Sequence, residues 1–442
     1  MKLQFHPIHS CWHLGALCLS LLTAAPLAAQ VKTFYVIKSL GTLGGNFSDA
    51  RNLNDKGEIV GVSKTAGGQD HAFVYLNGVM QDLGTLGGDN SIASAISGDG
   101  DIVGTAQKVG GEYRAVRFSR FAAAFNTDIS PPLSVRAEAT ANNDRGGGDE
   151  AVNVDFEIFA PPAKLRAFRL PGITPLNPQL LTTLGGNDNR AFGMNESGDI
   201  VGSSLTAGDA LRKAFVFTGG NTTSLGDLGG TNSEARDINN SNRIVGWSDI
   251  AGGGRRAFLY FNGAILNLGT LGGNSFAHAI NDNNEIVGTS ETAGPGSGAA
   301  FLYKNTTMTN LNTVLPANSG WNLIFANGIN ESGQIVGHGT FNGAGRAFLL
   351  EPDRKAPVVK PKSRFFATNL SSLTVSGTAL DEGTVRIVQF RVGGKGPFRK
   401  AAGTTRWSFR VPLKEGRNLV EIRARDTGGL VSRVAKVNIT RS

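Results

Sequence analysis

Cysteine is nearly absent from the sequence, and charged residues are fewer than usual. The two cysteines, Cys11 and Cys18, both lie within the first 30 residues. The remainder of the chain therefore has no means of forming a disulfide, a thiolate zinc site or a cysteine nucleophile. Charged residues make up 18% of the chain, compared with about 25% in an average globular protein, which disfavours long exposed helices and coiled coils.

Long apolar runs are missing after the first 30 residues. Within those residues, Lys2 precedes an apolar run from Leu14 to Leu22 and a small-residue segment ending at Ala29. This pattern predicts a secretory signal peptide over residues 1–30. No later stretch approaches the roughly 20 apolar residues of a membrane span. We expect an exported protein, extracellular or periplasmic, without a membrane span.

Glycine, in contrast, is abundant. It accounts for 60 of 442 residues, about twice the average share. Hydrophobic residues make up 40% of the chain, which is enough to bury a core. The composition therefore predicts a folded, turn-rich β protein.

Internal repetition is the dominant pattern. A triplet, in most copies a basic residue or His followed by Ala and Phe, recurs seven times at spacings of 43 to 52 residues. The copies are His71-Ala-Phe73, Arg114-Ala-Val116, Arg166-Ala-Phe168, Lys213-Ala-Phe215, Arg256-Ala-Phe258, Ala299-Ala-Phe301 and Arg346-Ala-Phe348. A period near 45 residues is typical of β-propeller blades.

Each unit divides into four short strands. In the first unit, alternation and turn residues place them at 49–53, 58–64, 71–76 and 79–83. The link between the first two strands always ends in Gly or Asn, the residues that best tolerate a left-handed backbone, as in a tight hairpin. We therefore predict an all-β fold: a propeller of seven four-stranded blades over residues 31–353. The repeated Ala and Phe would form its core.

The repeats resemble those of the HAF-repeat family of probable extracellular repeat proteins. The resemblance rests on His71-Ala-Phe73, on Leu-Gly-Gly motifs beginning at 43, 86, 184, 228 and 271, and on Ile-Val-Gly motifs beginning at 59, 102, 200, 244, 286 and 335. It implies a repeat fold and no agreed enzymatic activity. The third unit departs from the pattern, because it lacks both the Leu-Gly-Gly and the Ile-Val-Gly motif.

A second domain follows the repeats. Residues 354–362, rich in Lys and Pro, are typical of a stiff linker, and residues 363–442 alternate as short strands without a helical pattern. This region resembles bacterial immunoglobulin-like β-sandwiches, with Gly416–Asp426 similar to their penultimate strand.

Charge is unevenly divided between the two regions. Residues 354–442 carry 19 Lys and Arg against 5 Asp and Glu, whereas residues 31–353 carry 23 against 30. Three interpretations remain open: the basic sandwich binds an anionic polysaccharide or another cell-surface polyanion, it docks on its own acidic propeller, or it is simply a solvated basic surface. We expect no specific recognition of nucleic acid.

The residue before Ala in the repeated triplet is a second candidate. It is basic or His at His71, Arg114, Arg166, Lys213, Arg256 and Arg346. In a closed propeller, equivalent positions form a ring that could hold an anion or an acidic sugar. Alternatively, each cation pairs with a carboxylate or a backbone carbonyl of the adjoining blade.

Signatures of catalysis, metals and cofactors are lacking. The chain has no His-Glu-x-x-His, Gly-x-Ser-x-Gly or phosphate-loop motif, and its Asn-Asp-x-Gly turns lack the alternating acids of a calcium loop. We therefore expect no catalytic residues, no metal and no cofactor. An enzyme would place its acid and base in the irregular third unit. The acidic residues there are Asp128, Glu138, Asp144, Asp149, Glu150, Asp155 and Glu157.

These patterns favour a secreted, non-enzymatic binding or surface-interaction module. The alternatives are a propeller-type glycosidase or lyase and a structural matrix component.

Overall fold

The computed structural model describes residues 35–132, 134–144, 149–156, 164–171, 178–293, 298–316 and 318–442, and for 152–156 and 164 it describes the backbone only. The predicted signal peptide, residues 1–30, lies outside this part of the chain. Across the described ranges, no helix has the length and apolar character needed to cross a membrane.

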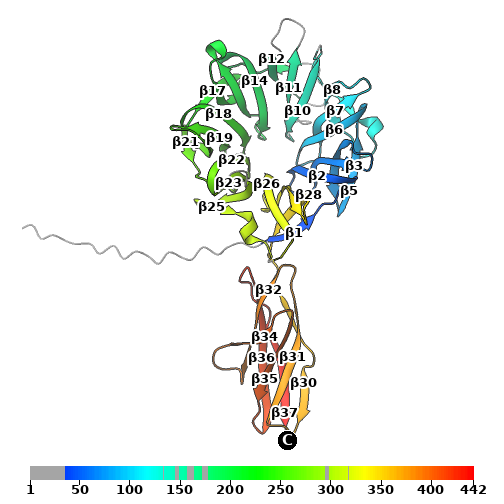
Figure 1. The fold of residues 1–442 in the computed structure, drawn as a ribbon, viewed down its shortest axis with the longest axis vertical. Helices are drawn as coiled ribbons and strands as arrows, with labels where there is room; N and C mark the ends of the chain where they lie inside the picture. The colour runs from blue at the N-terminus through cyan, green and yellow to red at the C-terminus, as the bar shows by residue number, and fades with distance from the viewer. Residues whose placement is uncertain are drawn as a thin grey trace, which may run out of the picture. The chain divides into compact units, whose positions relative to one another are not determined.

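The prediction of a seven-bladed all-β propeller is confirmed. Within the described ranges, the strands between Tyr35 and Pro352 form seven four-stranded antiparallel sheets, the blades. Figure 1 shows the first strand of each blade facing a common centre. The blades are, in order, β2 (Gly44–Leu53), β3 (Ile59–Thr65), β4 (Asp70–Leu76) and β5 (Val79–Gly84); β6 (Gly87–Ile96), β7 (Ile102–Lys108), β8 (Tyr113–Phe118) and β9 (Thr127–Asp128); β10 (Arg136–Asn142), β11 (Glu150–Phe156), β12 (Lys164–Leu170) and β13 (Gln179–Leu180); β14 (Gly185–Met194), β15 (Ile200–Thr206), β16 (Arg212–Thr218) and β17 (Asn221–Gly226); β18 (Gly229–Ile238), β19 (Ile244–Ile250), β20 (Arg255–Phe261) and β21 (Ala264–Asn267); β22 (Gly272–Ile280), β23 (Ile286–Thr292), β24 (Gly298–Lys304) and β25 (Thr307–Asn310); and β26 (Trp321–Ile329), β27 (Ile335–Phe341), β28 (Ala344–Pro352) and β1 (Tyr35–Ser39). The short 3-10 helices are η1 (Ala123–Phe125), η4 (Ala207–Asp209) and η5 (Leu311–Val314).

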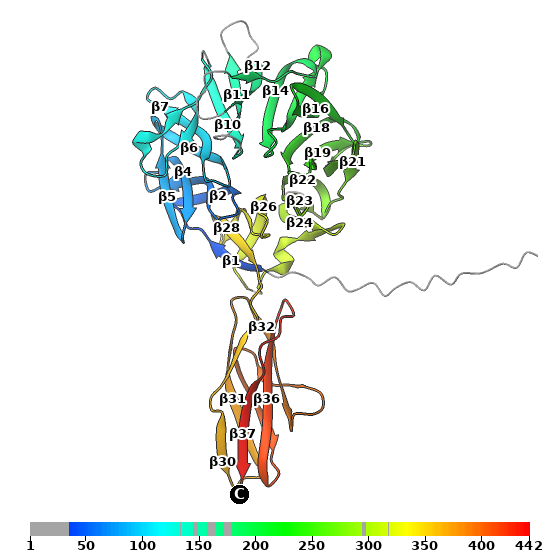
Figure 2. The same cartoon turned by 180° about the vertical axis from the view of Figure 1, so that it is seen from behind.

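The seventh blade is completed by the start of the propeller chain. Strand β1 pairs antiparallel with β28, with Tyr35 opposite Pro352 and Ser39 opposite Phe348. The first blade packs against this composite blade, since β2 contacts β26, β27 and β28 (Figure 2). The N-terminal and C-terminal strands of the propeller thus close the ring by pairing with each other.

The Ile-Val-Gly motif marks a close approach between the first two strands of a blade. In the fifth blade, Gly246 of β19 lies opposite Ala235 of β18, and a bulge follows at once in β18. A Cβ atom on Gly246 would overlap the backbone oxygen of Glu234. The motif therefore needs glycine because the facing backbone occupies the space of a side chain.

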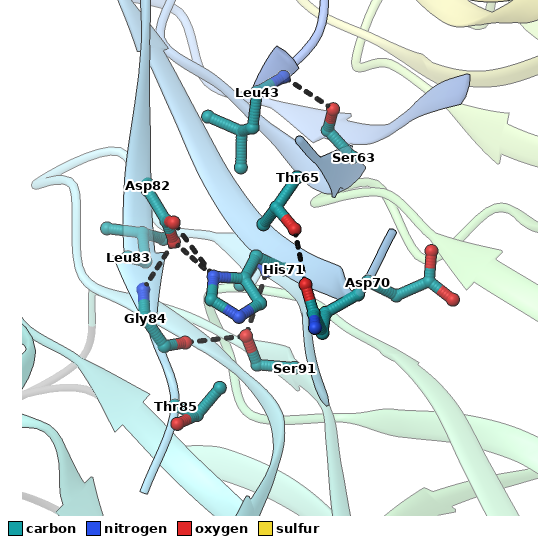
Figure 3. A network of polar contacts seen from close by, with 12 residues as sticks. Leu43, Ser63, Thr65, Asp70, His71, Asp82, Leu83, Gly84, Thr85 and Ser91 are labelled. Carbon is teal, nitrogen blue, oxygen red and sulfur yellow. Dashed lines mark hydrogen bonds and ion pairs between the residues drawn. The ribbon is translucent and has the colours of Figure 1, made fainter. Parts of the chain in front are cut away.

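The repeated Ala joins neighbouring blades. The backbone N–H of Ala72 donates to Ser91 Oγ in the next blade at 2.9 Å, and this hydroxyl donates to the carbonyl of Gly84 at 2.5 Å (Figure 3). The same N–H to hydroxyl bond links Ala214 to Ser233, Ala257 to Ser275 and, across the closure, Ala347 to Ser48. Ala72 and Phe73 are fully buried, as the sequence predicts for core positions.

The C-terminal region forms a β-sandwich. One sheet contains β29 (Val358–Pro361), β31 (Ser372–Leu380), β35 (Arg406–Pro412) and β34 (Ala402–Gly403); the other contains β30 (Phe365–Thr368), β37 (Ala435–Arg441), β36 (Gly416–Asp426), β32 (Val385–Val392) and β33 (Arg399–Lys400). The rings of Phe390 and Phe409, one from each sheet, stack in the core at 3.8 Å. Strand β29 lies within the segment 354–362 that the sequence suggests as a linker, so the connection ahead of the sandwich is only a few residues long.

Candidate functional site

The six cations before the repeated Ala lie on the third strands, β4, β8, β12, β16, β20 and β28, rather than on the inner strands. His71 Nδ1 lies 2.8 Å from a carboxylate oxygen of Asp82 (Figure 3), and Lys213 Nζ lies 2.5 Å from Asp227. The four arginines donate to backbone carbonyls: Arg114 to Ser134, Arg166 to Leu181, Arg256 to Gly273 and Arg346 to Asn46. Arg114 also forms an ion pair with Glu112 at 2.8 Å. Each cation thus has a partner, and a role in ligand binding stays a prediction.

The first strands of the blades, which we call the inner strands, enclose a cavity of about 740 Å³. We call this cavity the channel. Two pairs of oppositely charged residues line it, Arg51 with Asp49 at 3.7 Å and Arg136 with Glu138 at 2.6 Å. Arg236 also lines it and pairs at 2.6 Å with Glu234, which is buried outside the lining. Because both members of the first two pairs line the channel, their charges offset one another there. Arg236 also stacks 4.6 Å above the ring of Phe192. The channel is polar and close to neutral.

Two half-buried titratable groups, Asp237 and His278, line this channel. Burial raises the pKa of Asp237 to about 6, although Asp237 accepts hydrogen bonds from the backbone N–H groups of Ile238 and Ile280. Burial likewise lowers the pKa of His278 to about 4, and the nearby charge of Arg236 adds to this effect. His278 Nδ1 lies 3.0 Å from the carbonyl oxygen of Ala326. His278 is therefore neutral at physiological pH and serves as part of the channel wall.

The hairpins between first and second strands carry a belt of acidic groups. Each carboxylate accepts the backbone N–H of the preceding hairpin: Asp144 from Asp99, Glu196 from Asp144 and Asp55 from Glu331, at 2.8 to 3.1 Å. Burial and neighbouring carboxylates raise the pKa of Glu196 and of Glu331. These hairpin carboxylates thus link neighbouring blades through hydrogen bonds and make this end of the propeller acidic.

The acidic residues of the third unit are separated among different partners. Glu138 pairs with Arg136, Asp149 with Arg169, and Glu150 with Arg117. Asp128 lies 3.5 Å from Lys108, and Asp144 belongs to the acidic belt. The side chain of Asp155 and all of Glu157 lie outside the described residues. An acid and base pair in this unit stays a prediction.

One face of the sandwich is strongly basic. The register of β33, β32, β36 and β37 places alternate residues on the outer surface, because opposed residues in antiparallel strands point to the same side. We call this surface the basic face; it carries Lys400, Arg391, Arg417, Arg423, Arg425 and Lys436.

The basic face carries little negative charge and is organised by an aromatic ring. Glu421 lies on the same surface and pairs with Arg391 at 2.5 Å. The guanidinium groups of Arg391 and Arg423 stack on Phe398, at 4.7 and 3.9 Å from its centroid. Stacking holds the two cations side by side, with Arg391 paired to Glu421 and Arg423 Nε donating to Gln389 Oε1 at 3.0 Å.

Residues 48–353 match the model of a family described as "Protein of unknown function (DUF3466)". The chain belongs to this family. No curated protein matches it. Among solved structures, it is similar to the fibronectin(III)-like modules of Clostridium thermocellum CbhA, with 17% identity, coverage of 35% of this chain and 77% of that one, and a TM-score of 0.18. It is also similar to TolB from Acinetobacter baumannii, with 9% identity, coverage of 67% and 64%, and a TM-score of 0.40.

Sequence reasoning identified the charge of the sandwich but not its arrangement. The alternation of Arg423 and Arg425 around a buried Ala424 was a visible signal, since residues two apart in a strand share a face. The contribution of Phe398 carried no such signal, because it comes from the loop before β33.

Proposed function

We propose that this member of the family is a secreted, non-enzymatic binding module that attaches to anionic polymers through the basic face of its sandwich. The observation that carries this proposal is the register of β32, β36 and β37, which gathers cations on one flat surface. A flat array of cations suits an extended polyanion such as an acidic polysaccharide, because each cation contacts a separate anionic group of the chain.

The surroundings of the basic face support this function. Exposed Phe365 on β30 aligns with Asn438 of β37, so this ring lies on the same surface as the cations. Sugar rings pack well on aromatic surfaces while their carboxylates or sulfates meet the guanidinium groups. The face therefore combines charge with apolar contacts, as recognition of a charged carbohydrate requires.

The test is binding of the full chain to dextran sulfate, to alginate and to neutral dextran, each at low and high salt. We expect binding to the two polyanions at low salt, loss of binding at high salt, and no binding of neutral dextran. The double variant Arg423→Glu/Arg425→Glu should weaken binding about tenfold or more, since it reverses the centre of the face.

The matched control is Arg406→Glu/Arg410→Glu. These two exposed arginines lie on the outer surface of the opposite sheet, and their reversal changes the net charge by the same amount. Binding by this variant should stay within about threefold of the unmodified chain. Equal weakening by both double variants, or no polyanion binding at all, would rule out a dedicated basic face. Intact binding by both would place the site elsewhere, on the propeller.

A further inference from the structure

Three carboxylates converge at the end of the sandwich that follows the propeller. Asp353 comes directly after β28, Asp381 directly after β31, and Asp426 is the last residue of β36. One carboxylate oxygen from each residue lies within 4.8 Å of the other two. Residues from three separate parts of the chain thus bring negative charge to a single point.

Among the described residues, no cationic side chain forms an ion pair with these carboxylates, although Asp353 Oδ1 accepts the backbone N–H of Lys355 at 3.3 Å. Asp426 is fully buried; its Oδ1 accepts the backbone N–H of Leu430 at 2.8 Å, whereas its Oδ2 accepts no hydrogen bond of ordinary geometry. Asp353 Oδ2 and both oxygens of Asp381 are likewise buried without such a bond. Lys355, the nearest lysine in sequence, extends to Glu382 at 2.6 Å instead.

Burial of carboxylates without a paired cation costs free energy, and the pKa of Asp381 is raised accordingly. Desolvation and the charges of Asp353 and Asp426 raise the pKa of Asp381 to about 6, and backbone N–H groups of Glu382 and Gly383 offset only part of this effect. An uncompensated buried charge destabilises a fold unless a cation or a proton neutralises it. A group of this kind is therefore expected to have a ligand.

We propose that Asp353, Asp381 and Asp426 form a calcium site. Calcium prefers oxygen ligands at about 2.3–2.6 Å, so oxygens up to about 5 Å apart can share one ion. The site contains neither His nor Cys, which disfavours zinc and other softer metals. Magnesium fits less well, because it needs near-ideal octahedral geometry and gives up its water reluctantly.

Gly383 maintains the space for this cluster. A Cβ atom at this position would overlap Asp353 Oδ2 and come within 3.4 Å of Asp381 Oδ2. The loop after β31 therefore admits both carboxylates only because residue 383 has no side chain.

The site connects the two domains through the short segment 354–357. Asp353 directly follows the last propeller strand, whereas Asp381 and Asp426 belong to loops of the sandwich. Bound calcium would hold the connecting segment against the sandwich, and its loss would release that segment. This inference is independent of polyanion binding, since the basic face contains none of the three residues.

The direct test is calorimetric titration of calcium into the metal-stripped full chain, with equilibrium dialysis to count bound ions. We expect one calcium per chain, saturating below about 5 mM, the range of extracellular calcium modules. Asp381→Asn and Asp426→Asn should each weaken binding about tenfold or more, because a charged ligand is replaced by a neutral one of the same shape. Glu415→Gln, an exposed carboxylate at the opposite end of β36, should bind like the unmodified chain.

Two further measurements keep the proposal falsifiable if Asp426→Asn fails to fold. Gly383→Ala should weaken calcium binding by intruding on the cluster. Calcium should also slow tryptic cleavage at exposed Arg354 and Lys355 in the unmodified chain but not in Asp381→Asn. Absence of calcium binding up to about 5 mM, unchanged affinity in the Asn variants, or equal affinity for magnesium would each overturn the assignment.

Discussion

The side-chain amide of Asn330 donates a hydrogen bond to the backbone carbonyl of Asn54, 3.1 Å away and 276 residues earlier in the chain. This bond joins the seventh blade to the first. Equivalent bonds run from Asn239 to the carbonyl of Asn281 and from Asn281 to that of Asn330, each at 3.0 Å. The asparagine that begins the hairpin between the first and second strands therefore connects one blade to the next, including the two blades at the closure.

Replacement of this asparagine should weaken the closed ring. Asn330 is almost fully buried, and its Oδ1 also accepts the backbone N–H of Gln334 at 2.9 Å. Asn330→Ala would remove the acceptor of the Gln334 backbone N–H and leave the carbonyl of Asn54 with only its bond from the backbone N–H of Gly57, so we expect the free energy of unfolding to fall by about 2 kcal/mol in urea titrations. Asn221→Ala, at an exposed turn, should change it by less than about 0.5 kcal/mol. Equal effects of the two substitutions would contradict the role of Asn330 in joining the seventh blade to the first.

Gly246→Ala should destabilise the fifth blade. The added methyl group would overlap the backbone of the facing strand, so β18 and β19 would have to separate. We expect a loss of about 3 kcal/mol or more, or a failure to fold. The control is Gly298→Ala in β24, where the nearest atoms would lie at 3.5 and 3.6 Å, an ordinary contact distance. A Gly246→Ala protein as stable as this control would show that the close approach is not required.

Substitution of Lys213 tests whether the cations on the third strands stabilise the fold or bind a ligand. Its ammonium group is largely buried against Asp227, and this contact lowers the pKa of Asp227. Lys213→Gln should lower the free energy of unfolding by about 1 kcal/mol and leave dextran sulfate binding unchanged. A loss of polyanion binding without a loss of stability would favour the alternative in which the third-strand cations form the binding ring.

His278 should contribute to acid sensitivity. Because the pKa of His278 is about 4 in the folded chain and near 6.5 when unfolded, the unfolded state takes up the proton first as pH falls. The stability that His278 contributes is present above pH 6.5 and is lost towards pH 4. The charges that face it are those of Arg236 and Asp49.

The measurement compares the unmodified chain with His278→Asn in urea unfolding between pH 7 and pH 4. The stability difference between the two proteins should change by about 2–3 kcal/mol over this range in favour of the variant at low pH. Asp237 has a raised pKa, so its own contribution decreases as pH rises towards 6, but this contribution is present in both proteins. A constant difference would show that His278 does not titrate below its ordinary range.

The repeat pattern was sufficient to predict the blades because its residues have local causes. The Ile-Val-Gly glycine follows from a facing backbone, and the Ala-Phe pair follows from packing between sheets, so both recur wherever a blade recurs. The inner strand extends further than predicted, beginning at Gly44 instead of residue 49, because its first half carries polar residues. Ser48 and Ser91 were visible as repeated residues, but their bonds to the preceding blade depend on tertiary structure.

The candidate sites were less accessible to sequence reasoning. The cations before Ala form a regular pattern, yet their partners differ from blade to blade. Asp82 lies on the fourth strand of the same blade as His71, whereas Gly273 lies on the blade that follows Arg256, so no single local rule specifies the partner. Asp353, Asp381 and Asp426 are separated by 28 and 45 residues and share no motif. Only the folding of the sandwich loops brings them together, so a search for contiguous calcium loops did not find them.

The pairing of β1 with β28 has a consequence for the order of assembly. Ser39 and Phe348 are neighbours in the sheet although almost the whole propeller lies between them in the chain. Contacts of such long sequence separation are slow to form, and a nascent chain makes β1 first but β28 last. Until synthesis reaches residue 352, β1 has no partner and the seventh blade lacks its edge. A chain truncated before β28 would therefore leave β1 without its partner strand. Only a chain that contains all seven repeats can complete the seventh blade and close the ring.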